Sequence, residues 1–309
     1  MRALPAGIEI RVPASIANLG PGFDTLAVAV ELYLNLSVTI VDGCDELHFE
    51  FPGCKIDGEN YIERAFRFVA QQRGGGFPSL HVEVHSEIPM RGGLGSSAAA
   101  TVAGLRLYEA VAGPLPSQGL LNAACALEGH PDNVAAALLG GLTISCQLPD
   151  RSAFAVKMQW PDSVRFIVLT PQFPLATSAS RGALPEMIPR EDAVFNLQRV
   201  ALLLQAVQSG EYAVLREALQ DRIHQPFRQK LVPGLREALA LEHPDLLGVC
   251  LSGAGPSIVA LAERNLGQIE GLLSEAFLPT GLPFTMRRLA AHQELESAQH
   301  CGLAGLSRR

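Results

Sequence analysis

Residues 88–100 read IPMRGGLGSSAAA, a glycine-rich turn followed by two serines and a run of alanines. The glycines let the backbone turn tightly and bring its N–H groups close to a ligand. Serine often caps helices, so we expect Ser96 and Ser97 to cap the alanine-rich helix that follows. The unpaired N–H groups and the positive dipole end at a helix start favour an anion. The segment predicts a phosphate-binding loop, and a glycine turn before an ordinary helix is the alternative.

The loop differs from two familiar phosphate motifs. A Walker loop ends in Gly-Lys-Ser or Gly-Lys-Thr, whereas the lysines of this chain are Lys55, Lys157 and Lys230, none of them near the loop. A dinucleotide fingerprint needs a third glycine, where this chain has Ala98. Residues 80–87 alternate apolar and polar side chains, which predicts a half-buried strand before the loop. The loop therefore has the strand and helix context of a phosphate site without a lysine.

The composition excludes several classes of protein. The chain has 309 residues, 48% hydrophobic and 18% charged, so it is long enough for two domains and a large core. A net charge of −7 and the lack of a basic patch argue against nucleic-acid binding. The sequence has no signal segment and no apolar run of spanning length, so we expect a cytoplasmic enzyme without a membrane partner. Six cysteines without C-x-x-C spacing indicate buried free thiols rather than zinc sites or disulfides.

The periodicity of the apolar residues predicts a mixture of strands and helices. Residues 8–51 alternate apolar and polar positions and carry turn signals at 20–22 and 42–43, which indicates strands joined by hairpins. Residues 248–262 form another glycine turn between apolar flanks, and a second domain is expected to open after Pro161. Because no regular βαβ rhythm is present, the order favours an α+β fold with mainly antiparallel sheets. Further strands are expected at 140–147 and 163–171, and helices at 61–72, 98–111, 120–127, 192–208 and 212–223.

Two further segments are rich in functional residue types. Residues 12–32 place Asn18 and Asp24 around a Gly-Pro-Gly turn, and residues 251–261 form a second loop of small residues between apolar flanks. Taken with the phosphate loop, in this order and at this spacing, they resemble the GHMP kinases. The resemblance covers roughly residues 8–265.

The resemblance implies an α+β, two-domain GHMP kinase fold. Residues 1–158 would form an ATP-binding domain around a mixed or antiparallel sheet, and residues 159–309 a C-terminal ferredoxin-like α/β sandwich. Residues 291–309 read as a polar tail or terminal helix to which we assign no function. By this resemblance, ATP is expected to contact Pro89, Arg91, Gly92, Gly93, Leu94, Gly95, Ser96, Ser97 and Ala98.

Four segments are most similar to the homoserine kinase members of that family: residues 17–24, 128–141, 177–181 and 221–234. The similarity implies ATP-dependent phosphorylation of L-homoserine to O-phospho-L-homoserine in threonine biosynthesis. A site for this small amino acid must hold an ammonium, a carboxylate and an alcohol. By the resemblance, two arginines would grip the carboxylate through forked hydrogen bonds. The expected substrate residues are Asn18, Asp24, His130, Asp132, Thr177, Arg181, Arg228 and Gly253.

The resemblance also implies a magnesium ion and a mode of catalysis. Ser97 and Glu128 would hold Mg²⁺, although Glu128 alone could merely end its helix. Related sugar and mevalonate kinases carry an aspartate as a possible general base, whereas this chain has Asn133 in the comparable segment. The resemblance therefore implies direct attack by the alcohol, whose proton passes to the phosphate or to water. Asn133 would orient the alcohol, and Asp24 is a minor candidate for the base.

Several alternatives stay open at this point. Isolated arginines such as Arg181 and Arg228 are commonly surface residues, His130 is of a type that also caps helices or lies in cores, and Asp24 follows a turn where aspartate is common for local reasons. At the level of function, the chain could phosphorylate another small alcohol or be a silent nucleotide-binding regulator of the same fold. A homodimer is possible.

Overall fold

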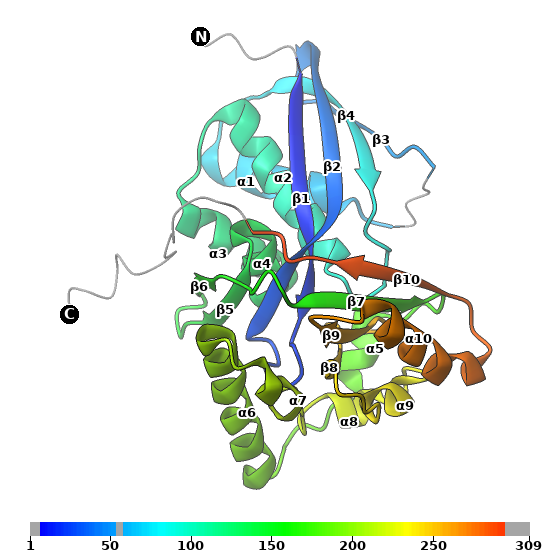
Figure 1. The fold of residues 1–309 in the computed structure, drawn as a ribbon. Helices are drawn as coiled ribbons and strands as arrows, with labels where there is room; N and C mark the ends of the chain where they lie inside the picture. The colour runs from blue at the N-terminus through cyan, green and yellow to red at the C-terminus, as the bar shows by residue number, and fades with distance from the viewer. Residues whose placement is uncertain (1–6, 54–57, 294–309) are drawn as a thin grey trace.

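The computed structural model describes residues 7–53 and 58–293. The first part of the chain forms a mixed, mainly antiparallel sheet in the order β3-β4-β2-β5-β6, with β1 paired to the long strand β2, and β3 parallel to β4. Helices α2, α3 and α4 pack against this sheet, and α1 packs on α2 and α3 (Figure 1). The strands are β1 Ile8–Ala17, β2 Leu26–Cys44, β3 Leu47–Glu50, β4 Pro78–Ser86, β5 Leu142–Gln147 and β6 Ala153–Met158, and the helices are α1 Tyr61–Arg73, α2 Ser96–Ala112, α3 Ser117–Glu128 and α4 Asp132–Leu139.

The second sheet has the ferredoxin-like strand order. Its four strands run β10-β7-β9-β8 and all neighbours are antiparallel, as expected for a βαββαβ unit. Helices α9 and α10 cover one face (Figure 1). The strands are β7 Arg165–Pro171, β8 Leu246–Leu251, β9 Ile258–Ala262 and β10 Phe284–Leu289; the helices are α5 Thr177–Gly182, α6 Arg190–Ser209, α7 Leu215–Ala218, α8 Gln225–Arg228, α9 Leu235–Leu239 and α10 Leu266–Phe277, with 3₁₀ turns at Tyr212–Val214 and Leu278–Thr280. The predicted fold class is therefore confirmed.

Strand β7 explains how the two parts share a core. Side chains alternate between the faces of a strand, and here Phe166 and Val168 join the large core of the first sheet, whereas Ile167 and Leu169 join the core under α10. Both faces are buried, and residues 166–169 of the strand are accordingly all apolar. The chain also returns to the first sheet after β10, where Ala291 bridges to Val30. The predicted division into residues 1–158 and 159–309 remains a prediction.

Three local predictions were wrong. No hairpin forms at residues 42–43, because β2 continues to Cys44 through an irregular register and β3 instead pairs with β4 in parallel. The predicted long helix at 212–223 breaks after Ala218. The buried side chain of Asp221 instead accepts the backbone N–H groups of residues 223–225, just ahead of and at the first residue of α8. Cys44 and Cys146 are exposed rather than buried, while Cys125 and Cys250 are buried as expected; Cys54 and Cys301 lie outside the described residues.

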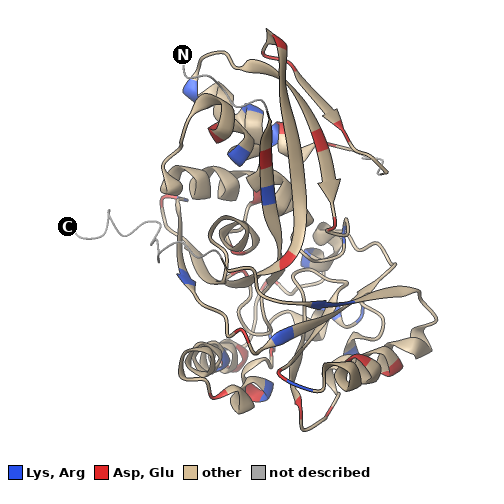
Figure 2. Ribbon diagram, turned by 45° about the horizontal axis from the view of Figure 1, so that its top comes forward, with Lys and Arg blue, Asp and Glu red and all other residues tan. Residues whose placement is uncertain are grey.

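The charged residues of both signs are interspersed over the described part of the chain, and the basic ones form no continuous stripe there (Figure 2). No helix among the described residues is both long and apolar enough to cross a membrane.

Candidate active site

The glycine loop delivers backbone N–H groups to the start of α2. Gly95 precedes the helix with φ of 70°, and no side chain caps the first turn. The expected capping by Ser96 and Ser97 is therefore wrong, because both residues already lie inside the helix. A side chain at position 95 would collide with the Ser15 hydroxyl, so this left-handed residue must be glycine. The uncapped N–H groups remain suited to an anion.

The phosphate loop is held by the second glycine loop, between β8 and β9. The Ser252 hydroxyl donates to the Gly93 carbonyl at 2.6 Å, and the backbone N–H of Ser257 donates to the Gly92 carbonyl at 3.1 Å. A Cβ on Gly93 would lie 2.6 Å from the Ser252 carbonyl oxygen. The two segments that resemble family motifs therefore meet across the two sheets, and only glycine permits this approach.

The other residues of the loop that are expected to contact ATP differ in how far they are buried. The side chains of Leu94 and Ala98 are buried in the core, and the Leu94 carbonyl accepts the backbone N–H of Ser15 at 3.1 Å. They can contribute to a ligand site only through the backbone. Arg91 is exposed with φ of 55°, and Pro89 is half-buried.

The two predicted magnesium residues meet. The Ser97 hydroxyl lies 2.7 and 2.9 Å from the two carboxylate oxygens of Glu128, and the Thr101 hydroxyl donates to the same carboxylate at 2.8 Å. Glu128 does end α3, but its side chain is only 8% exposed and faces α2. Among the described residues no three His, Cys, Asp or Glu side chains form a metal cluster. One carboxylate and one hydroxyl fit magnesium, which needs few protein ligands when phosphates supply the rest.

The turn after β1 brings four predicted substrate residues together. The Asn18 amide donates to the Gly253 carbonyl at 3.0 Å and accepts the backbone N–H of Asp24 at 3.0 Å. Arg181 grips Asp24 with both terminal nitrogens, at 2.9 and 2.7 Å. The hydrogen bond to Asp24 raises the pKa of Arg181. This ion pair is about one-third exposed on each side, so it is accessible from solvent.

Arg228 lies beneath this pair and is 1% exposed, so the alternative of a surface arginine is wrong. Its Nη1 donates to the Gly253 carbonyl at 2.9 Å and to Nδ1 of His224 at 3.1 Å, and its Nε lies 3.5 Å from the Ser180 carbonyl. Among the described residues no hydrogen bond engages Nη2, which is therefore available to a ligand. Burial, and then the charge of Arg181, lowers the pKa of Arg228 to about 10, so the group stays charged at neutral pH.

A hydrogen-bonded chain at the start of α4 connects to the phosphate loop. Asp132 is buried and its Oδ1 lies 2.9 Å from Nδ1 of His130, while it accepts both the backbone N–H and the amide of Asn133. The Ser15 hydroxyl donates to Oδ1 of Asn133 at 2.8 Å. Burial opposes protonation of His130, but the hydrogen bond and charge of Asp132 outweigh it and raise the pKa of His130. Asn133 is therefore held in one orientation beside Gly95.

Thr177 stands apart from the other predicted residues. It is the first residue of α5 and is exposed, one turn before Arg181. No hydrogen bond links it to the cluster in the described residues.

Sequence reasoning missed several residues that complete the site. Phe23 stacks on His224 at 5.3 Å between ring centroids, and the guanidinium groups of Arg181 and Arg228 lie 5.7 and 5.3 Å from the Phe23 ring. Thr101, Ser15 and His224 were also missed. The signal for Phe23 was its place inside the Gly-Pro-Gly-Phe-Asp sequence.

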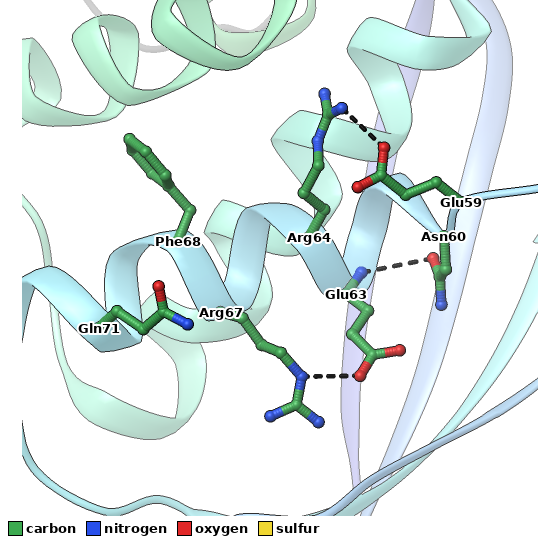
Figure 3. Close-up of a pocket in the computed structure, with 7 residues that line it drawn as sticks. All are labelled: Glu59, Asn60, Glu63, Arg64, Arg67, Phe68 and Gln71. Carbon is green, nitrogen blue, oxygen red and sulfur yellow. Dashed lines mark hydrogen bonds and ion pairs between the residues drawn. The ribbon is translucent and has the colours of Figure 1, made fainter.

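A hollow of about 360 Å³ lies along α1 (Figure 3), close to Glu128, one of the two predicted magnesium residues. Arg64 connects the two, because its Nη2 donates to the Leu127 carbonyl at 3.1 Å and lies 4.0 Å from the Glu128 carboxylate. Asn60 caps α1 from the wall of the hollow. The lining residues are Glu59, Asn60, Glu63, Arg64, Arg67, Phe68 and Gln71.

Known proteins match both parts of the chain. The family models "GHMP kinases N terminal domain" and "GHMP kinases C terminal" match residues 60–141 and 203–276. The homoserine kinase of Solibacter usitatus is 40% identical over 293 residues, covering 91% of this chain and 93% of that protein. The homoserine kinase of Saccharomyces cerevisiae is 36% identical, with coverage of 91% and 95%. The crystal structure of homoserine kinase from Cytophaga hutchinsonii shares the fold, with a TM-score of 0.83 and 24% identity over 95% of this chain and 98% of that one.

Proposed function

The chain belongs to the GHMP kinase family, and we propose from this premise that it is a homoserine kinase. It transfers the γ-phosphate of ATP, the phosphate donor of the family, to the hydroxyl of L-homoserine and forms O-phospho-L-homoserine for threonine biosynthesis. Curated homoserine kinases about 40% identical over most of the chain support this assignment. The structural observation that carries it is the meeting of Asp24, Arg181 and Arg228 beside the second glycine loop, at Gly253.

These three charges suit the two charged ends of an amino acid. Asp24 is the partner that an ammonium needs, and Arg181 and Arg228 are partners for a carboxylate. In the protein alone, Asp24 and Arg181 satisfy each other. We infer that L-homoserine takes over both partners when it binds, so that its ammonium meets Asp24 and its carboxylate meets Arg181 and Nη2 of Arg228. Gly253 and Asn18 fix the walls of this site.

The hydroxyl end of the substrate is assigned to Asn133 and His130. The alcohol oxygen attacks the γ-phosphorus, the bond from that phosphorus to the bridging oxygen breaks, and ADP leaves. Asn133 is an amide and orients the alcohol rather than taking its proton, which passes to the transferred phosphate or to water. In the proposed complex Asp24 pairs with the ammonium of L-homoserine, at the other end of the substrate from the reacting hydroxyl, which does not favour Asp24 as the base.

The phosphates of ATP are assigned to the N-terminus of α2. The backbone N–H groups of residues 93–97 stabilise the negative charge. Ser97 and Glu128 would hold Mg²⁺, which, when bound, neutralises charge on the transferring phosphate, and Thr101 orients the carboxylate. We assign the nucleoside end of ATP to the hollow along α1, because Arg64 joins that hollow to Glu128.

The test is coupled ADP release with L-homoserine, mevalonate and galactose at fixed ATP and magnesium. Homoserine should be by far the best substrate. An equal or higher rate with mevalonate or galactose would refute the assignment, and no turnover with any alcohol would favour a silent nucleotide-binding member. The cytoplasmic location and the homodimer expected from the sequence stay predictions.

A further inference from the structure

His224 is buried and contacts Arg228 directly. It precedes the short helix α8, and Arg228 lies four residues later, so their side chains are neighbours on the same face, one turn apart. Nδ1 of His224 lies 3.1 Å from Nη1 of Arg228, and its Nε2 lies 2.7 Å from the Gly20 carbonyl oxygen. The imidazole therefore bridges Arg228 and the Gly-Pro-Gly turn, and none of it is exposed.

These two contacts fix the protonation state and the tautomer of the imidazole. A guanidinium only donates, so Nδ1 must be unprotonated, and a carbonyl only accepts, so Nε2 must carry the hydrogen. Burial lowers the pKa of His224 against the opposing charge of Asp221, whose carboxylate lies 3.6 Å from Nε2. His224 is therefore neutral and in one tautomer, in which it can accept from Arg228.

The consequence for Arg228 is a fixed guanidinium plane. Nη1 has two hydrogens, and it has two acceptors, Nδ1 of His224 and the Gly253 carbonyl. The ring of Phe23 packs against both the imidazole and the guanidinium. With Nη1 held in this way, the guanidinium cannot rotate about its own axis without losing a buried hydrogen bond, which is costly.

We propose that His224 is a positioning residue for the substrate carboxylate: by holding Nη1 of Arg228, it keeps Nη2 in place as the donor that recognises the carboxylate. This inference rests on the proposed function, because it assumes a substrate with a carboxylate beside Arg228. It assigns to His224 a role in specificity that acts entirely through Arg228.

Hydrogen bonds that do not involve the imidazole also hold the fold at this point. The buried carboxylate of Asp221 accepts the backbone N–H groups of residues 223–225, and Asn196 donates to both Asp221 and the Pro21 carbonyl. These bonds hold the start of α8 against the Gly-Pro-Gly turn. Loss of the imidazole should therefore disturb Arg228 more than it disturbs folding.

Two variants separate the two hydrogen bonds of the imidazole. In His224→Asn, the amide oxygen can occupy the place of Nδ1 and still accept from Arg228, whereas in His224→Gln the amide nitrogen can occupy the place of Nε2 and still donate to Gly20. The exposed His85 is the matched control, as His85→Asn. KM and kcat would be measured for ATP, L-homoserine and L-homoserine methyl ester, with thermal melts of each variant.

We expect His224→Gln to raise the KM for homoserine about tenfold, the order of one lost hydrogen bond to a charged group. The KM for the methyl ester and for ATP should change little, and His224→Asn should stay within about threefold of the parent and of His85→Asn. Equal rises in KM for homoserine and its ester, equal losses in both His224 variants, or unfolding of both would overturn the proposal. Failure of the parent to use homoserine would instead refute the proposed function.

Discussion

Arg181 and Arg228 should respond differently to replacement by lysine, although both are assigned to the substrate carboxylate. Arg181 is paired with Asp24 and its side chain is 37% exposed, so solvent weakens the pair, and Arg181→Lys should change the free energy of unfolding by only about 0–1 kcal/mol. Arg228 is buried and donates to His224 and Gly253. Arg228→Lys should therefore also lower the melting temperature, because lysine cannot reproduce both bonds.

For binding, both variants lose a planar donor to a carboxylate. A hydrogen bond to a charged group contributes about 1.5–3 kcal/mol, so the KM for homoserine should rise roughly ten- to hundredfold in each variant, while the KM for ATP stays nearly constant. The assay is coupled ADP release with L-homoserine and its methyl ester. Esterification removes the anion, so the difference between parent and variant should largely disappear with the ester. If a variant discriminates equally against both substrates, that arginine is structural and the carboxylate is recognised elsewhere.

Three further changes test the rest of the site. Ser97→Ala and Glu128→Ala should weaken the magnesium dependence of activity more than they weaken folding, as magnesium titrations and thermal melts would show; a Glu128→Ala titration like that of the parent would exclude this carboxylate as a ligand. Asn133→Ala should retain measurable turnover with an unchanged pH profile of kcat, because an amide is not a base, and a newly lost ionisation would contradict this. Asp132→Asn should remove the interaction that raises the pKa of His130. Relative to Asp132→Asn, the parent should have a larger free energy of unfolding below pH 6.5, and this difference should disappear as pH rises through the raised pKa of His130. Urea unfolding of both proteins at two pH values would detect this change. A difference in the free energy of unfolding that is independent of pH would refute it.

The sequence predicted the parts of the site that depend on local chemistry. The glycine loop needs positive φ at Gly93 and Gly95 and a helix directly afterwards. Both requirements can be predicted from consecutive residues, namely the glycines and the alanine-rich run that follows them. The pairing of Ser97 with Glu128 came from the family resemblance alone, and the structure brings the two together. The fold class followed from the order of strand and helix patterns and is confirmed by the two sheets.

The missed residues depend on contacts that are distant in sequence. Ser15 contacts Asn133, which lies 118 positions later, and nothing in an apolar strand singles out this hydroxyl. His224 was missed because the predicted helix, 212–223, ended just before it. Without a predicted helix over residues 224–228, the four-residue spacing between His224 and Arg228 did not indicate that the two side chains are neighbours. Capping by Asp221 at a break in the helical pattern was the available signal.

The ion pair between Asp24 and Arg181 gives a reason for specificity that does not depend on the size of the site. Opening this pair leaves a carboxylate and a guanidinium that each need a new partner, and L-homoserine brings both as one zwitterion. A substrate with a carboxylate but no ammonium would satisfy Arg181 and leave Asp24 without a counter-charge, while an uncharged sugar would satisfy neither. Because an unpaired polar group costs more than a formed hydrogen bond contributes, the proposed binding mode predicts that the site rejects such alcohols by the groups that they leave unpaired. In the same binding mode, the separate hydrogen bonds of Arg228 to His224 and Gly253 would keep it in place while Arg181 changes partner.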